Sequence, residues 1–300
     1  MDTITANIQE SKVLGLREKL SAYIELTKPR IAFLLVLTSA AGFYLGTTGT
    51  FDLVLFANTL VAISLLAFGV ATLNQFWESD LDRLMTRTAG RPLPTGRITR
   101  TEALVFGLVQ IIIAEAYLLV LVNGLTALLG IIVIVGYVLV YTPLKTRTSA
   151  STAIGALPGA LPPLMGWTAA SGDITLAAWA LFAIQFLWQF PHFLAIAWMY
   201  RHEYARAGIV MLPVVEPEGK ITARQIVMFA FLLLPVSLAP FFLGLSGFVY
   251  LGGSTMLGLW FLWVSIRAGR AKTDEQARKL LLVSVIYLPL LFILMVADKR

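Results

Sequence analysis

Cysteine is absent from this chain of 300 residues, and charged residues are scarce. Without cysteine there can be no disulfide, no thiolate metal ligand and no cysteine nucleophile. Charged residues make up 13% of the sequence, about half of their share in a soluble domain, and hydrophobic residues make up 58%. So few charges cannot cover a soluble surface, and we expect the apolar residues to face lipid. The first thirty residues contain no continuous apolar core, so we expect no cleaved signal peptide.

Nine segments are long and apolar enough to cross a membrane as helices. They are too long and too uniformly apolar for the strands of a barrel, which predicts an all-α, polytopic membrane protein. The predicted spans are Ile31–Thr48, Leu53–Phe76, Thr101–Val122, Leu125–Tyr141, Ala153–Ser171, Leu176–Tyr200, Arg224–Leu245, Gly247–Ile266 and Leu280–Ala297. We divide the chain into an N-terminal segment, residues 1–30, and a nine-helix domain, residues 31–300.

The stretch Ser11–Leu26 has a different pattern from the nine spans. Apolar residues such as Leu16 and Leu20 recur at helical spacing among lysine, arginine and glutamate. This pattern is typical of a helix that lies on the membrane surface. We therefore predict an interfacial helix before the first span.

Lysine and arginine are distributed unevenly between the two ends of the predicted spans. All of them except Lys299 and Arg300 lie before the first span or in alternate connections, and the intervening short connections contain none. Positive charge marks the cytoplasmic side of a membrane protein. We therefore predict a multi-pass protein of the cell membrane with a cytoplasmic N-terminus and an external C-terminus.

The end of the second span carries a row of oxygen-bearing side chains. Asn74, Glu78 and Asp82 are spaced by four residues, which places them along one face of a helix. Such a row suits Mg²⁺, which prefers oxygen ligands and shares its remaining positions with phosphate and water. Polar groups inside an apolar helix are costly and are usually functional. A solvated, salt-bridged loop is the plainer interpretation of the same residues.

Three arginines continue the same four-residue period as Arg83, Arg87 and Arg91. Guanidinium groups match the geometry of phosphate oxygens. Carboxylates followed by arginines at a membrane surface therefore indicate a metal-bound pyrophosphate carried by a lipid.

Two other cytoplasmic connections add candidate residues. Tyr141 ends the fourth predicted span, and Lys145 and Arg147 lie in the connection to the fifth span. Lys145 could stabilise an oxyanion or could simply mark the cytoplasmic side. Glu203 could complete a second metal site or could pair with Arg206.

Two ionisable groups lie within the predicted spans. His192 follows a kinking proline in the sixth span, and a lone histidine there is more often hydrogen-bonded than bound to a metal. Glu115 lies in the middle of the third span as a structural group or a pocket residue, and the sequence does not decide between these.

On these residues the chain resembles the UbiA-type intramembrane prenyltransferases, and within them the branch that prenylates heme. The resemblance covers nearly the whole chain and includes the acidic row from Asn74 to Asp82. The matching segments are Leu26–Arg30, Asp82–Leu93, Tyr141–Lys145, Ile154–Trp167, Trp188–Leu194 and Glu203–Pro213. The sequence departs from the relatives' pattern at Glu78 and Glu203, where aspartate is common.

The resemblance implies nine helices around a central cavity that is covered by cytoplasmic loops. It implies farnesyl diphosphate and heme B as substrates, with Mg²⁺ as the cofactor. The implied catalytic residues are Asn74, Glu78, Asp82, Lys145 and Glu203, of which the first three would hold the metal. The implied diphosphate ligands are Arg83, Arg87, Arg91, Arg147 and Tyr141. The implied heme contacts are His192, Tyr200 and Tyr204.

Other functions remain open at this point. A relative that prenylates a quinone precursor or a chlorin would share the acidic row. A secondary transporter would also place polar groups among apolar helices, although it would concentrate them near the midplane, where Glu115 stands alone. The lipid bilayer is an expected partner, heme A synthase or a terminal oxidase assembly is a candidate protein partner, and no nucleic acid is implied.

Overall fold

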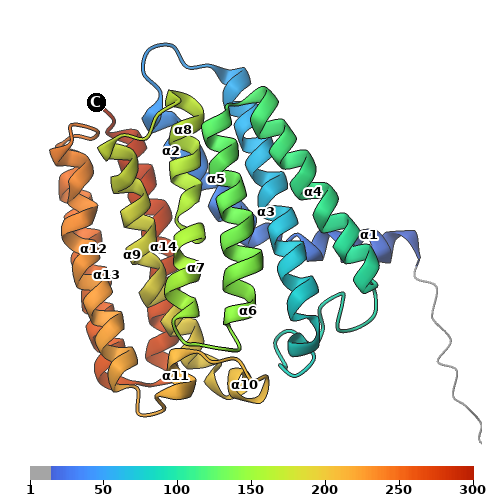
Figure 1. Ribbon diagram of the computed structural model, residues 1–300. Helices are drawn as coiled ribbons and strands as arrows, with labels where there is room; N and C mark the ends of the chain where they lie inside the picture. The colour runs from blue at the N-terminus through green and yellow to red at the C-terminus, as the bar shows by residue number, and fades with distance from the viewer. Residues whose placement is uncertain (1–14) are drawn as a thin grey trace, which may run out of the picture.

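The computed structural model describes residues 15–300, which are almost wholly helical. Long helices run side by side, with short connections at one end of the bundle and the small helices α10 and α11 at the other (Figure 1). Within the described range, β pairing is limited to one isolated bridge between Ser246 and Lys299. The all-α prediction is confirmed. The elements are α1 (Leu16–Leu26), α2 (Pro29–Gly46), α3 (Leu53–Asp82), α4 (Arg100–Leu121), α5 (Gly124–Ile134), the π-helix η1 (Val135–Tyr141), α6 (Thr142–Leu144), α7 (Ser151–Gly159), α8 (Leu161–Ser171), α9 (Leu176–Met199), α10 (Arg201–Arg206), α11 (Leu212–Val215), α12 (Lys220–Phe242), α13 (Phe248–Ala271) and α14 (Asp274–Ala297).

Eight helical stretches of residues 15–300 are long and apolar enough to cross a membrane. The remaining predicted span, Ala153–Ser171, is divided at Ala160 into α7 and α8, which follow one another along the bundle (Figure 1). Prolines cause this division, because a proline has no N–H to donate within a helix. Pro163 leaves the carbonyl oxygen of Gly159 without its helical donor, and the side-chain amide of Gln185 donates to that oxygen instead at 2.9 Å.

Helix α3 is 30 residues long and continues past Phe76, where we predicted its end, to Asp82. The Asp52 side chain caps its first turn by accepting a hydrogen bond from the Leu55 N–H at 2.9 Å. At 1.5 Å per residue the helix spans about 45 Å, which exceeds a hydrocarbon core of about 30 Å. The row from Asn74 to Asp82 therefore lies on one continuous helix, at its C-terminal end.

The last two long helices also extend further than predicted. Helix α13 continues to Ala271 and α14 begins at Asp274, so Lys272 and Thr273 alone separate them. Thr273 caps α14, and Asp274 and Glu275 occupy its first turn, where negative charge is favourable. Of the basic residues between the eighth and ninth predicted spans, Arg267, Arg270, Arg278 and Lys279 are therefore helical, and Lys272 is not.

Helices α2 and α8 pack with almost no space between their backbones. A Cβ atom added at Gly42 would lie 2.0 Å from the carbonyl oxygen of Pro163, and one added at Gly166 would lie 1.9 Å from that of Ser39. Glycine is required where two backbones approach so closely. This contact holds the first crossing against the proline-rich segment.

Helix α1 lies across the long helices instead of along them (Figure 1). Its helical part begins at Leu16, and residues Ser11–Leu14 of the predicted interfacial helix lie outside the described range. Two ion pairs fix α1 to the bundle, Lys19 with Glu102 at 2.5 Å and Arg97 with Glu25 at 2.8 Å. Leu16, Leu20 and Ile24 share its exposed face, as a helix on a membrane surface requires.

Candidate functional site

The polar row on α3 is buried. Asn74 is 1% exposed, Glu78 is 7% exposed and Asp82 is 1% exposed. All three side chains line one cavity of about 170 Å³ at the end of the bundle where two long loops lie. The first long loop is residues 83–99, and the second is residues 200–219, which include α10 and α11. Burial of two carboxylates at this position is costly unless each is paired.

Each group of the row contacts a cation from another part of the chain. The pairs are Asn74 Oδ1 with Lys28 Nζ (2.9 Å), Glu78 Oε1 with Lys145 Nζ (2.5 Å), and both oxygens of Asp82 with Arg91 Nη1 (2.9 and 2.7 Å). Lys28 joins α1 to α2, Lys145 follows α6, and Arg91 lies between α3 and α4. Three separate connections thus meet at one row of oxygen atoms.

These contacts shift the pKa values of the two lysines in opposite directions. Burial, with the nearby charges of Arg91 and Lys145, lowers the pKa of Lys28 to about 7. Burial also acts to lower the pKa of Lys145, but Glu78 and two neighbouring tyrosines outweigh it and raise that pKa well above its usual value. A bound anion would favour the charged form of both side chains.

Aromatic and apolar side chains form the rest of the cavity wall. The lining includes Tyr137 and Tyr141 from η1, Phe193 and Ile196 from α9, and Tyr204 from α10. The Lys145 ammonium group lies 4.6 Å from the centre of the Tyr141 ring, a favourable cation–π contact. Gly155 of α7 makes room for this tyrosine, because a Cβ atom there would lie 2.5 Å from the ring.

The two long loops contact each other beside the cavity. The Arg87 N–H donates to Glu203 Oε2 at 3.2 Å, and the Arg87 guanidinium donates to the Tyr204 hydroxyl at 3.4 Å. The same guanidinium lies 4.8 Å from the centre of the Tyr200 ring. The third loop is joined to them because the Val210 N–H donates to the carbonyl oxygen of Lys145 at 2.7 Å.

The cavity gathers most of the residues proposed from the sequence, but several lie outside its lining. Arg83 is exposed and lies 4.0 Å from Asp80, and Arg147 is exposed after α6. Glu203 and Tyr200 contact Arg87 beside the cavity and do not line it.

His192 faces a different neighbour, helix α14. Its Nδ1 atom is 2.8 Å from the Ser284 hydroxyl, and its ring stacks on Trp188 with centres 4.7 Å apart. The side chain is therefore hydrogen-bonded, as expected for a lone histidine, and it does not line the cavity.

Sequence reasoning missed Lys28 and Tyr137 as lining residues. Lys28 belongs to the segment Leu26–Arg30 that carried part of the resemblance, but its charge was fully explained by membrane topology. Tyr137 precedes Tyr141 by one helical turn, so its spacing was an available signal.

The donor set of the row fits a hard divalent cation. Asn74, Glu78 and Asp82 offer oxygen atoms, which Mg²⁺ prefers. Within residues 15–300 no group of three or more His, Cys, Asp or Glu side chains could hold a metal by itself. A cation here would need further oxygen atoms from water and from a phosphate, as is usual for Mg²⁺.

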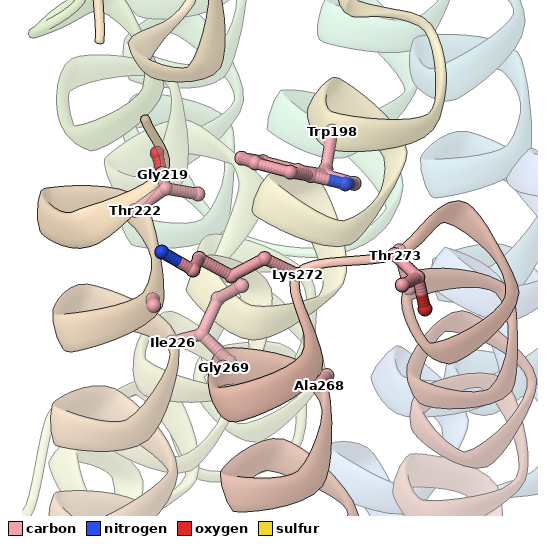
Figure 2. Close-up of a pocket in the computed structure, with 10 residues that line it drawn as sticks. Trp198, Gly219, Thr222, Ile226, Ala268, Gly269, Lys272 and Thr273 are labelled. Carbon is pink, nitrogen blue, oxygen red and sulfur yellow. The ribbon is translucent and has the colours of Figure 1, made fainter. Parts of the chain in front are cut away.

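A second cavity lies where α9, α12, α13 and α14 meet (Figure 2). Its volume of about 10 Å³ is enough for roughly one water molecule. The Trp198 ring lies next to Gly219 and Lys272, and a Cβ atom at Gly219 would lie 2.4 Å from that ring. This cavity is too small for a lipid chain, and the close approach of Gly219 to Trp198 packs the end of the second long loop against α9.

The fold and the site define an intramembrane prenyltransferase: residues 35–293 match the UbiA prenyltransferase family, and the chain belongs to that family. A protoheme IX farnesyltransferase of Solibacter usitatus is 48% identical over 286 residues, which cover 92% of this chain and 98% of the relative. A protoheme IX farnesyltransferase of Koribacter versatilis is 44% identical, with 95% of each chain covered.

Solved structures share the fold at low sequence identity. A structure of digeranylgeranylglyceryl phosphate synthase has a TM-score of 0.78 at 18% identity, covering 94% of this chain and 98% of that chain. A UbiA homologue from Archaeoglobus fulgidus bound to GPP and Mg²⁺ has a TM-score of 0.67 at 17% identity, covering 92% of this chain and 99% of that chain. The helices of this chain are therefore arranged as in a known membrane fold.

Proposed function

We propose that this protein transfers the farnesyl group of farnesyl diphosphate to a vinyl group of heme B, with addition of water, to give heme O. The observation that carries the proposal is the buried row of Asn74, Glu78 and Asp82, which faces three cations at the end of an apolar bundle. The choice of heme B as acceptor is supported by relatives at 44–48% identity, each named protoheme IX farnesyltransferase.

The row on α3 is the proposed holder of Mg²⁺, through the oxygen atoms of Asn74, Glu78 and Asp82. When bound, the cation would neutralise negative charge on the diphosphate as it leaves. The relative bound to GPP and Mg²⁺ supports a divalent cation in this family.

Side chains around the row bind the diphosphate in this proposal. Arg87, Arg91 and Lys145 line the cavity and would donate charge-assisted hydrogen bonds to the diphosphate. The Tyr141 ring holds the Lys145 ammonium group through a cation–π contact. Arg83 and Arg147 are exposed at the same end and raise the local concentration of an anionic substrate. Glu203 holds the backbone of Arg87 and so orients the first loop.

The reaction begins when the allylic C–O bond breaks and the diphosphate departs with the bonding electrons. A heme vinyl group attacks the farnesyl cation, and water adds to the new cation beside the porphyrin. The departing diphosphate accepts the proton that this water releases. The walls formed by Tyr137, Phe193 and Ile196 exclude water from the first cation.

We assign heme contacts to His192, Tyr200 and Tyr204. His192 has its Nδ1 atom engaged by Ser284, so its second ring nitrogen, Nε2, is the candidate ligand for heme iron. Tyr204 lines the cavity and Tyr200 lies beside it, at the boundary where heme propionates would meet water.

Two alternative functions were open from the sequence. Membership of a prenyltransferase family removes the secondary transporter. Prenylation of a quinone precursor or a chlorin is the remaining alternative, and the names of the relatives favour heme over both.

We also propose that the N-terminus is cytoplasmic and the C-terminus external, so that the cavity receives farnesyl diphosphate from the cytoplasm. The distribution of lysine and arginine supports this orientation. Heme A synthase or a terminal oxidase assembly, which uses the product, is the proposed protein partner.

Incubation of the purified protein in detergent with heme B, Mg²⁺ and geranyl, farnesyl or geranylgeranyl diphosphate tests the proposal. Mass spectrometry should detect heme O with farnesyl diphosphate, and chelation of Mg²⁺ should abolish it. Prenylation of a quinone precursor in place of heme would contradict the proposal.

A further inference from the structure

Lys28 occupies the junction between the surface helix α1 and the first crossing α2. Its φ angle is +48°, and it is one of two residues other than glycine in the range 15–300 with positive φ. Residues other than glycine rarely adopt this left-handed backbone conformation. Strained backbone of this kind is retained where the surrounding structure enforces it, often at functional sites.

Neighbouring contacts enforce the conformation of Lys28. The Gln75 side chain donates to the carbonyl oxygen of Leu26 at 2.8 Å, so the end of α1 is fixed to α3. Pro29 begins α2 immediately after the lysine. The chain must therefore turn sharply at Lys28, and the turn directs its ammonium group to Asn74 at 2.9 Å.

Depth along α3 distinguishes Lys28 from the other cations. Asn74 is the group of the row nearest the membrane interior, and Asp82, eight residues later, is nearest the loops, which separates them by about 12 Å along the helix. A prenyl chain extends from its diphosphate into the apolar part of the bundle. The α-phosphate, which carries the prenyl group, must then lie toward Asn74, and the β-phosphate must lie toward Asp82 and Arg91.

We propose that Lys28 binds the α-phosphate of the prenyl diphosphate and stabilises the charge that develops there as the C–O bond breaks. The inference rests on the proposed function and adds a catalytic residue to it. Arg87 and Arg91 then serve chiefly to bind the distal phosphate. Because the charge on the α-phosphate oxygen grows in the transition state, Lys28 should affect kcat more than substrate binding.

The test compares Lys28→Met and Lys28→Arg with Arg30→Gln, a matched removal of positive charge two residues away on an exposed site outside the cavity. Lys28→Met should lower kcat for heme O formation by about 100-fold, the effect of losing one strong donor to a developing anion. Lys28→Arg should recover part of that loss, and Arg30→Gln should stay within about twofold of the original rate, as expected of a surface site.

Binding of inorganic pyrophosphate in the presence of Mg²⁺, measured by calorimetry, separates catalysis from affinity. Lys28→Met should weaken this binding by less than about tenfold, well below its effect on kcat. Binding of Mn²⁺ without pyrophosphate, followed by electron paramagnetic resonance, should be unchanged. Gel filtration and thermal unfolding in detergent should show that every variant is folded.

Three results would overturn the inference. An unchanged kcat in Lys28→Met would remove Lys28 from the reaction. A loss of Mn²⁺ affinity equal to the loss of kcat would mean that the lysine acts only through Asn74, and a variant that does not fold, with Lys28→Arg equally inactive, would make it purely structural. If the original protein binds no pyrophosphate and forms no heme O, the proposed function fails together with the inference.

Discussion

Glu78 and Asp82 are two carboxylates that line the same cavity and pair with different cations. Each is buried against one positive charge, Lys145 for Glu78 and Arg91 for Asp82. A neutral amide at either position would keep the shape of the side chain and remove a negative charge that a divalent cation needs.

We expect Glu78→Gln and Asp82→Asn each to lower heme O formation by at least about 100-fold, because charge on the leaving diphosphate would no longer be neutralised. The protein should remain folded and inserted. Heme O formed per folded enzyme is the measurement, and Asp80→Asn, on an exposed side chain that pairs with Arg100, is the control. Activity near the original level in both variants would remove the metal assignment.

The sequence was most informative where one helix carries the whole pattern. The row on α3 could be predicted because residues spaced by four lie on the same face of a helix. Lys28 could not, because its role depends on the left-handed turn and on contact with a residue 46 positions away. The neighbour of His192 was equally hidden, since Ser284 lies 92 positions away on α14 and only the packing of α9 against α14 brings the two side chains together.

At the scale of elements, the segment from Ser151 to Ser171 shows why the number of spans and the number of helices differ. Its hydropathy predicts one crossing, and its prolines divide that crossing into α7 and α8. The division is stabilised by Gln185 on α9, which bonds to Gly159. A partner from another helix cannot be identified from local sequence.

The glycines between α2 and α8 give a prediction for stability. Gly166→Ala should lower the free energy of unfolding by at least about 1–3 kcal/mol, because the new methyl group would meet the backbone at Ser39 and the two helices would have to separate. Gly252→Ala on α13 is the control, since a Cβ atom there would have no neighbour within 4 Å. Thermal unfolding in detergent should show a lower melting temperature for the first variant alone, and equal melting temperatures would contradict the packing argument.

For the whole molecule, the distribution of charge predicted which connections would meet. The three connections that carry Arg91, Lys145 and Glu203 do converge at one end of the bundle. Hydropathy and charge thus predict which connections lie at the same end of the bundle. They do not determine which helices are neighbours, because that depends on contacts such as Gly42 against Pro163.

Absence of cysteine makes the orientation directly testable. Single cysteines at Thr95, Pro217 and Ser171 should report the side of the membrane on which each connection lies. A membrane-impermeant thiol reagent should label Ser171→Cys in intact cells, and it should label Thr95→Cys and Pro217→Cys after the cells are opened. Labelling of Thr95→Cys and Ser171→Cys from the same side would mean that a span has been miscounted.

The length of α3 has a kinetic consequence. Its 30 residues exceed the hydrocarbon thickness by about ten residues, so the row begins near the depth of the lipid headgroups while the prenyl chain stays among the acyl chains. Farnesyl diphosphate that arrives from the cytoplasm therefore inserts its prenyl chain into the bilayer before the row binds its diphosphate, and the relevant concentration is the mole fraction in the bilayer. Adding inert phospholipid at constant total substrate should slow the reaction by surface dilution, whereas adding buffer at a constant lipid-to-substrate ratio should leave the rate per enzyme nearly unchanged.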